Sequence, residues 1–85
     1  MVQIPSEPGL VADAQIDITG DLCPMTFVRT RLALDRLPVG AVLRVRLRGA
    51  EPRDNVPRSA VALGHEVLHS ETDADGVTLL WLRRR

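Results

Sequence analysis

Cys23 is the only cysteine of the chain, and it lies in the stretch Gly20-Asp21-Leu22-Cys23-Pro24-Met25-Thr26. A strand-like segment ends just before it and a helix-like segment begins just after it. We therefore expect the thiol at or near a helix N-terminus, where backbone N–H groups lack partners and the helix dipole favours negative charge. Such an environment lowers the pKa of a thiol and makes it a nucleophile. If this chain carries out chemistry, the sequence assigns it to Cys23.

A second interpretation of Cys23 is structural, because free cysteine is among the residue types most often buried. The following residue favours the reactive interpretation. Pro24 suits the first position of a helix, where its missing N–H would have no partner. It would thereby set the start of the helix and the direction in which the thiol points. A single cysteine excludes an internal thiol–disulfide cycle. Any acceptor sulfur is therefore expected on another protein.

The elements that position Cys23 follow from the apolar pattern. Residues 1–13 lack periodicity and are expected to form a flexible tail ahead of a single domain, residues 14–85. A strand is predicted from Ala14 to Gly20, and the clearest helix from Pro24 to Leu37. The apolar positions at helical spacing in that helix are Phe27, Val28, Leu32, Leu34 and Leu37. Its polar face is supplied by Arg29, Arg31, Asp35 and Arg36.

The rest of the chain predicts three strands and a second helix. Residues 42–48 alternate aliphatic and arginine side chains, which predicts a strand with one wet face. Asp54 or Asn55 is expected to cap a helix that ends at Gly64, with Pro57 in its first turn. Residues 66–71 and 77–82 read as strands joined by a turn, and Trp81 is expected in the sheet core.

The resulting order is strand, helix, strand, helix, strand, strand. It predicts an α/β fold, a two-layer sandwich with a four-stranded mixed sheet and both helices on one face.

Composition narrows the function classes. The chain has 85 residues, is 45% hydrophobic and has a formal net charge of zero, so no global basic field draws it onto nucleic acid. All its basic residues are arginines, which excludes Schiff-base chemistry and a Walker-type lysine. No signal-peptide pattern and no apolar run of membrane-spanning length is present, so we expect a reducing cytoplasm.

The histidines and the arginine-rich segments have weaker chemical interpretations. His65 and His69 with Cys23 would supply only three ligands, whereas structural zinc sites need four, so no metal site is expected. A Cys–His pair for acyl transfer is conceivable, but so small a domain has little room for a substrate pocket. Nucleic-acid binding through the arginines of 44–48 and 83–85 is an alternative that lacks stacking aromatics.

The pattern around Cys23 resembles the TusA/SirA-like family of small sulfur-carrier proteins. The likeness covers roughly residues 15–85. It is carried by Gly20-x-x-Cys23-Pro24-x-x-x-Val28-x-Thr30-Arg31-x-Ala33-Leu34, then Leu37-x-x-Gly40, Leu43-x-Val45, Arg53-Asp54-x-x-Pro57 and Gly64-His65-Glu66. The family usually has a second proline where this chain has Thr26, and an apolar residue where it has Asp21. Thr26, at the third helical position if Cys23 is the N-cap, would add a hydroxyl able to donate to the sulfur. Asp21 would disfavour a thiolate.

The resemblance implies that Cys23 accepts sulfane sulfur as a persulfide and relays it to an acceptor cysteine. The donor would be a cysteine desulfurase or a rhodanese-like protein, and no cofactor would be needed. Family members serve tRNA thiolation, molybdenum cofactor biosynthesis or sulfur metabolism. The candidate docking residues are Arg29, Arg31, Arg53 and Asp54.

Two alternatives to this interpretation stay open. The arginines can also be read as a solvated helix face, and Asp54 as a helix cap. The whole chain can also be read as a non-catalytic interaction or regulatory module of the same fold.

Overall fold

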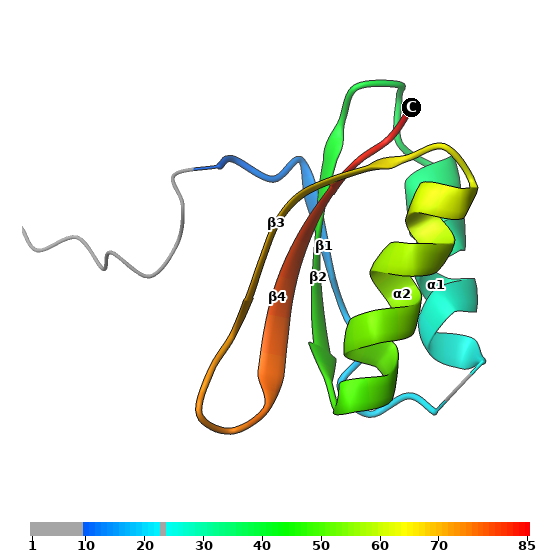
Figure 1. The fold of residues 1–85 in the computed structure, drawn as a ribbon. Coiled ribbons are helices and arrows are strands. Elements are labelled where there is room, and N and C mark those ends of the chain that lie inside the picture. Colours follow the sequence, from blue (N-terminus) through cyan, green and yellow to red (C-terminus); the bar gives the residue numbers. More distant parts are fainter. Residues whose placement is uncertain (1–9, 23) are drawn as a thin grey trace, which may run out of the picture.

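The computed structural model describes residues 10–22 and 24–85. Its elements are β1 (Ala14–Asp17), α1 (Met25–Asp35), β2 (Val42–Arg48), α2 (Ala50–Ala62), β3 (Glu66–Thr72) and β4 (Val77–Arg83). The strand order is β1-β2-β4-β3, with β1 parallel to β2 and the other neighbours antiparallel. Both helices cover the same face of the sheet (Figure 1). The predicted α/β sandwich with a four-stranded mixed sheet is therefore confirmed.

The core lies between the sheet and the two helices. The alternation along β2 turns Leu43, Val45 and Leu47 toward the helices, where each is fully buried. The arginines of the same strand face the other side, as the sequence predicts for a strand with one wet face. Ile18, just beyond β1, extends this core at 1% exposure, and its N–H continues the ladder to the Arg46 carbonyl at 2.8 Å.

Helix α1 buries Leu34 as predicted, and Phe27 and Leu37 pack against the core, but the other two predicted apolar positions are exposed. Its buried residues are Thr26, Thr30 and Leu34, whereas Val28 and Leu32 are 40% and 49% exposed. Thr30 can face the core because its hydroxyl donates to the Thr26 carbonyl at 2.8 Å, which satisfies it inside its own helix. An apolar pattern scores threonine as polar and so missed that Thr26 and Thr30 belong to the buried face.

Helix α2 begins earlier than predicted. Gly49, at φ 104°, is the N-cap and turns the chain directly out of β2. Pro52 therefore takes the first-turn place assigned to Pro57, which lies inside the helix. The expectation that Asp54 or Asn55 caps the helix is wrong, because both lie within it.

Two further predictions need correction. β1 ends at Asp17, three residues before Gly20. Trp81 is fully buried, but on the face away from the helices, where its register partners are Arg44 and His69. Its neighbours Leu80 and Leu82 take the core side. Neither helix has the length and apolar character to cross a membrane, judged over the described residues.

Candidate functional site

The loop between β1 and α1 carries the candidate site, and its first half is a tight turn. The carboxylate of Asp17 accepts the backbone N–H of Thr19 at 2.9 Å and its hydroxyl at 2.7 Å. The pKa of Asp17 is lowered to about 2. The hydrogen bond from the Thr19 hydroxyl is the largest cause, and the Thr19 N–H and the nearby Arg46 guanidinium also lower it. The N–H of Asp21 then donates to the Ile18 carbonyl at 3.0 Å. The entry into the loop is thus fixed by its own polar groups.

The second half of the loop leads into α1. The Met25 N–H donates to the Leu22 carbonyl at 2.8 Å, and the first bond of helical spacing runs from Val28 to the Pro24 carbonyl. Pro24 is the N-cap rather than the first helical residue, so Thr26 is the second helical residue rather than the third. Cys23 and any contact between its thiol and the Thr26 hydroxyl lie outside the described residues.

The start of α1 is electrostatically open to an anion. No described side chain caps the helix, and its first turn contains no acidic residue. Within the described residues of the first turn, no side chain therefore neutralises the positive end of the helix dipole. The carboxylate of Asp21, two residues before Cys23, is paired with Arg29, whose Nη1 lies 2.6 Å from Oδ2. Arg29 also reaches the Asp17 carbonyl at 3.4 Å.

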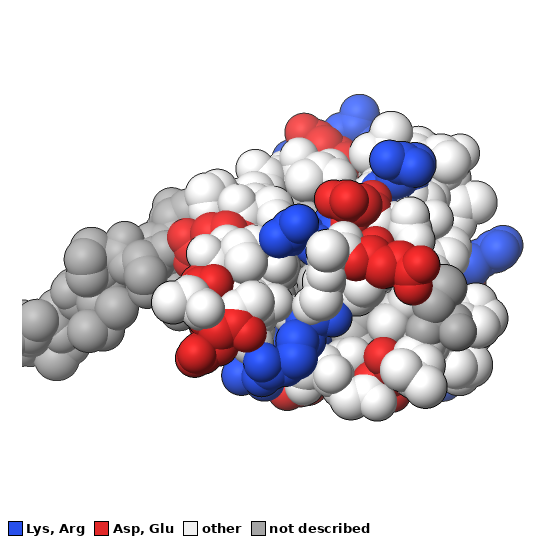
Figure 2. Space-filling model, turned by 60° about the horizontal axis from the view of Figure 1, so that its bottom comes forward, with Lys and Arg blue, Asp and Glu red and all other residues white. Residues whose placement is uncertain are grey.

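In the described part of the chain, the other candidate docking residues make no contact with this loop. Arg31 is exposed and forms no ion pair there. Arg53 and Asp54 are exposed near the start of α2, with Nε and Oδ1 4.0 Å apart. The two helices begin at the same end of the molecule (Figure 1). At that end, basic and acidic groups are interspersed with uncharged surface (Figure 2). Of the four candidates, only Arg29 contacts the loop.

A set of exposed apolar side chains beside the loop was missed by the sequence analysis. We call Leu22, Met25, Val28 and Leu32 the apolar stripe; they are 82%, 48%, 40% and 49% exposed. The three helical members follow at i, i+3 and i+7 and so lie along one side of α1. A hollow of about 250 Å³ adjoins the stripe, lined by Ile16, Arg29, Leu32, Ala33 and Arg36. The sequence held a signal for this stripe, because the apolar residues of this helix are spread over a wider arc than a helix can bury on one face.

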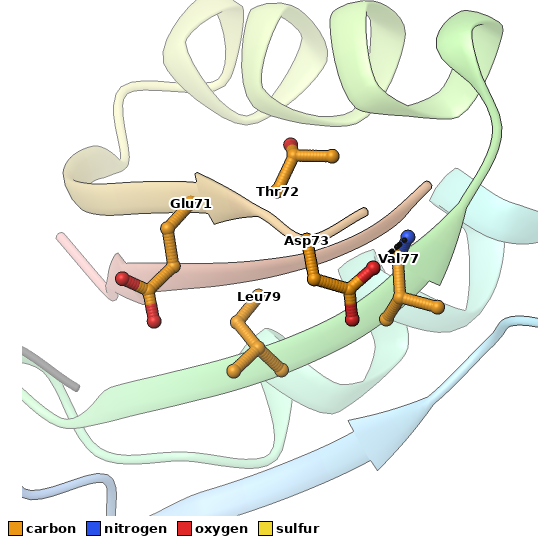
Figure 3. A pocket seen from close by; sticks show the side chains of 5 residues that line it. All are labelled: Glu71, Thr72, Asp73, Val77 and Leu79. Carbon is orange, nitrogen blue, oxygen red and sulfur yellow. Dashed lines mark hydrogen bonds between the residues drawn. The ribbon is translucent and has the colours of Figure 1, made fainter. Parts of the chain in front are cut away.

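A second hollow, of about 290 Å³, lies beside the β3–β4 turn and is lined by Glu71, Thr72, Asp73, Val77 and Leu79 (Figure 3). Its polar side chains are engaged locally. Asp73 accepts the N–H groups of Asp75 and Val77, Thr72 bonds to Thr78, and Glu71 lies 3.4 Å from His69. This hollow therefore presents no set of free polar groups for a ligand.

The two histidines occupy unrelated positions. His65 precedes β3 and accepts the Arg85 N–H at 3.1 Å. His69 lies on the outer face of the sheet, edge-on to Trp81 with ring centroids 5.4 Å apart. Within the described residues, no group of three or more histidine, cysteine or acidic side chains could hold a metal ion.

The fold agrees with what comparison with known proteins finds. The family model described as sulfurtransferase TusA matches residues 14–84. The chain belongs to the TusA family. The sulfur carrier protein TusA of Pseudomonas syringae pv. syringae is 32% identical over 82 residues, covering 94% of this chain and 96% of the relative. That of Pseudomonas entomophila is 34% identical over 76 residues, covering 89% and 94%.

A solved structure agrees with the TusA assignment. The crystal structure of a SirA-like protein from Desulfitobacterium hafniense superposes with a TM-score of 0.73 at 25% identity. It covers 82% of this chain and 95% of that one. The TusA-family match supports a role in sulfur transfer.

Proposed function

We propose that this protein is a sulfur carrier in which Cys23 accepts sulfane sulfur as a persulfide and relays it to a cysteine of a partner. The family match, which spans the Cys23-Pro24 motif, is the observation that carries the proposal. The uncapped, acid-free start of α1 supports it, because the helix dipole remains available to stabilise a thiolate. Apolar side chains exposed around the loop support a protein partner rather than a small substrate.

The proposed transfer balances without a redox cofactor. The Cys23 thiolate attacks the terminal sulfur of a donor persulfide; one S–S bond forms, the donor's S–S bond breaks and the donor cysteine leaves as a thiolate. Delivery repeats the exchange with an acceptor thiolate as the nucleophile. A cysteine desulfurase or rhodanese-like protein is the donor we propose, in a reducing cytoplasm. Acceptors in tRNA thiolation, molybdenum cofactor biosynthesis or sulfur metabolism fit this chemistry.

Docking is proposed to use the apolar stripe together with the exposed charges near it. Leu22 and Met25 flank the Cys23-Pro24 pair in the sequence, so a partner that reaches the thiol must cover them. The side chain of Arg31 is exposed, and Arg53 and Asp54 are exposed as a loose pair 4.0 Å apart, so all three can meet charges on the partner. Arg29 is already paired with Asp21, which makes it the weakest of the docking candidates.

The test is loading with sulfur, followed by intact mass measurement. The protein is incubated with a cysteine desulfurase and L-cysteine, with Cys23→Ala as the matched control. We expect a gain of one sulfur atom that a thiol reductant removes and that the control lacks. An unchanged mass with a desulfurase and with a rhodanese charged with thiosulfate would contradict the proposal.

The non-catalytic module is the second candidate, favoured by the two departures from the motif. Thr26 is 4% exposed and faces the core, so it has a packing role whatever Cys23 does. Cys23→Ala separates the two functions in cells: a module would keep its cellular role without the thiol, and a carrier would lose it.

A further inference from the structure

We propose that the hollow between β1 and α1 binds an extended acidic segment of a partner protein. The segment adds to the free edge of β1 and places one apolar side chain and one carboxylate in the hollow, whose volume is about 250 Å³. The inference rests on the proposed carrier function and deepens it, because it names the chemistry by which a partner is recognised. The residues that carry it lie on β1, on α1 and at the C-cap of α1.

The edge of β1 supplies the main-chain groups. β1 is the outermost strand of the sheet and pairs only with β2. Such a strand leaves backbone N–H and C=O groups without strand partners, and an extended peptide can pair with them. Ile16 packs against the core on the side of the helices, whereas Asp17 pairs with Arg46 on the outer face. Side chains of an added strand alternate in the same way, so every second one points toward α1.

The lining of the hollow combines an apolar floor with positive charge. Ile16 and Ala33 are partly buried against the core, and Leu32 also belongs to the apolar stripe. The two other lining residues are Arg29 and Arg36, and no described acidic residue lines the hollow. An apolar side chain can therefore be buried here, and a carboxylate beside it meets an arginine.

Of the two arginines, Arg36 has the charge that is available to a partner. Arg29 pairs with Asp21 at 2.6 Å, and its bond to the Asp17 carbonyl places it at the C-terminal end of β1. Arg36 is exposed and forms no ion pair with any described residue. The two arginines are two helical turns, or about 10 Å, apart along α1, which runs alongside the strands (Figure 1). Same-face side chains of a strand are about 7 Å apart, so an apolar residue and the next same-face carboxylate fit between them.

A second copy of this chain lacks the chemistry that the hollow requires. If two β1 strands paired edge to edge, each would present Ala14 and Ile16 on the side of the helices. Neither side chain carries a carboxylate, and the two hollows would bring arginines of like charge together. The charge of the hollow therefore favours a different protein with an acidic segment.

The experiment titrates the full-length, ¹⁵N-labelled protein with a short synthetic peptide blocked at both ends. In this peptide, threonine alternates with leucine and glutamate in turn, so that leucine and glutamate share one face of the strand. One control peptide has glutamine in place of glutamate, and another is N-methylated at its central residues and cannot donate strand hydrogen bonds. The protein variants are Arg36→Glu, Arg36→Gln and Arg58→Glu. Arg58 is the matched control, because it is an exposed arginine of α2 without an ion pair to any described residue.

We expect amide shift changes in β1 and in the second half of α1. Arg36→Glu should weaken the Kd for the peptide about tenfold at low salt, Arg36→Gln about threefold, and Arg58→Glu less than about twofold. The glutamine peptide and the N-methylated peptide should each bind at least about fivefold more weakly than the parent peptide.

Equal binding of the N-methylated peptide, equal effects of Arg36→Glu and Arg58→Glu, or no binding at about 1 mM peptide would overturn the proposal. Dimerisation through β1, seen by sedimentation and by shifts in the peptide-free protein, would also overturn it. If Arg36→Glu does not fold, Arg36→Gln carries the comparison. Sulfur loading is scored separately. Peptide binding without loading would reject the carrier function and keep the acidic-segment site, and loading without peptide binding would do the reverse.

Discussion

The outer face of the sheet and the exposed side of α1 both carry arginines, but these arginines differ in what they contact. On the sheet, Arg46 pairs with Asp17 at 2.9 Å, Arg48 donates to the Asp75 carbonyl at 3.0 Å, and Arg44 bonds to Gln15. Along α1, Arg29 pairs with Asp21, whereas Arg31 and the C-cap residue Arg36 form no ion pair with any described residue. The apolar stripe lies beside them.

This contrast separates a solvated surface from the surface that we propose for docking. Charged groups on the sheet are matched by neighbours in the same layer and cover Trp81, whose ring lies 5.9 Å from the Arg44 guanidinium carbon. The arginines proposed as an alternative nucleic-acid contact are thus already engaged. The side of α1 leaves apolar side chains uncovered beside unpaired cations, which is the arrangement that a partner can bury.

The largest expected effect is on the sheet face. Trp81→Ala removes a fully buried side chain, so we expect a loss of about 3–5 kcal/mol in the free energy of unfolding. Met25→Ala, on a side chain 48% exposed, should change it by about 0.5 kcal/mol or less. Urea titration followed by circular dichroism measures both. Equal losses would show that Trp81 is no better packed on the outer face of the sheet than Met25 is on α1.

The next effect concerns transfer rather than stability. Leu32→Asp places a carboxylate in the apolar stripe and should lower kcat/KM for sulfur transfer from a desulfurase about tenfold, which corresponds to about 1.4 kcal/mol. The matched control is Val61→Asp on α2, where the side chain is 55% exposed against 49% for Leu32. If both variants lose transfer equally, or neither does, the apolar stripe is not the docking surface.

A smaller difference is expected between two arginines. Arg44→Gln removes a hydrogen bond to Gln15 and a cation over the Trp81 ring, which should cost about 0.5–1 kcal/mol of stability. Arg31→Gln should cost nothing measurable, since exposed cations without partners contribute little. Thermal unfolding of both variants distinguishes the faces, and a larger loss for Arg31→Gln would reverse their assignment.

The sequence predicts those parts of the fold that depend on local pattern. Residues 43–48 alternate strictly, and the strand, Val42–Arg48, has the predicted limits. The burial of Thr30 on α1 escaped prediction because its hydroxyl is satisfied by the Thr26 carbonyl, a bond that exists only once the helix has formed. The start of α2 depends on Gly49 adopting a positive φ at the end of β2, which an apolar pattern does not register.

The candidate site, like the fold, has parts that the sequence predicts and parts that it does not. The motif and its helix could be located from residue types and order alone. The pairing of Asp21 with Arg29 could not, because eight residues and a turn separate them and the contact depends on how the loop folds back. Arg29 was accordingly expected to meet a partner, whereas it meets the loop.

The smallest expected effect is a pH dependence on the sheet face. Asp17 has its pKa lowered to about 2, against about 3.9 in an unfolded chain. A lowered pKa in the folded state means that this contribution to stability is complete above about pH 4 and is lost as the pH falls toward 2. Asp17→Asn should therefore flatten the decline in stability across that window and leave the slope above pH 5 unchanged. Urea midpoints measured from neutral to acid pH provide the test.

The order of causes sharpens this last prediction. The Thr19 hydroxyl is the largest single cause of the lowered Asp17 pKa, ahead of the hydrogen bond from Arg46 and of the charge of Arg46 taken singly. Thr19→Val should then remove more of the acid-window slope than Arg46→Gln does, although only the second variant breaks an ion pair. The opposite ranking would mean that charge pairing across the sheet, rather than the turn at the end of β1, holds the Asp17 carboxylate ionised. The contrast between a matched sheet face and an open helix face would then rest on ion pairs alone.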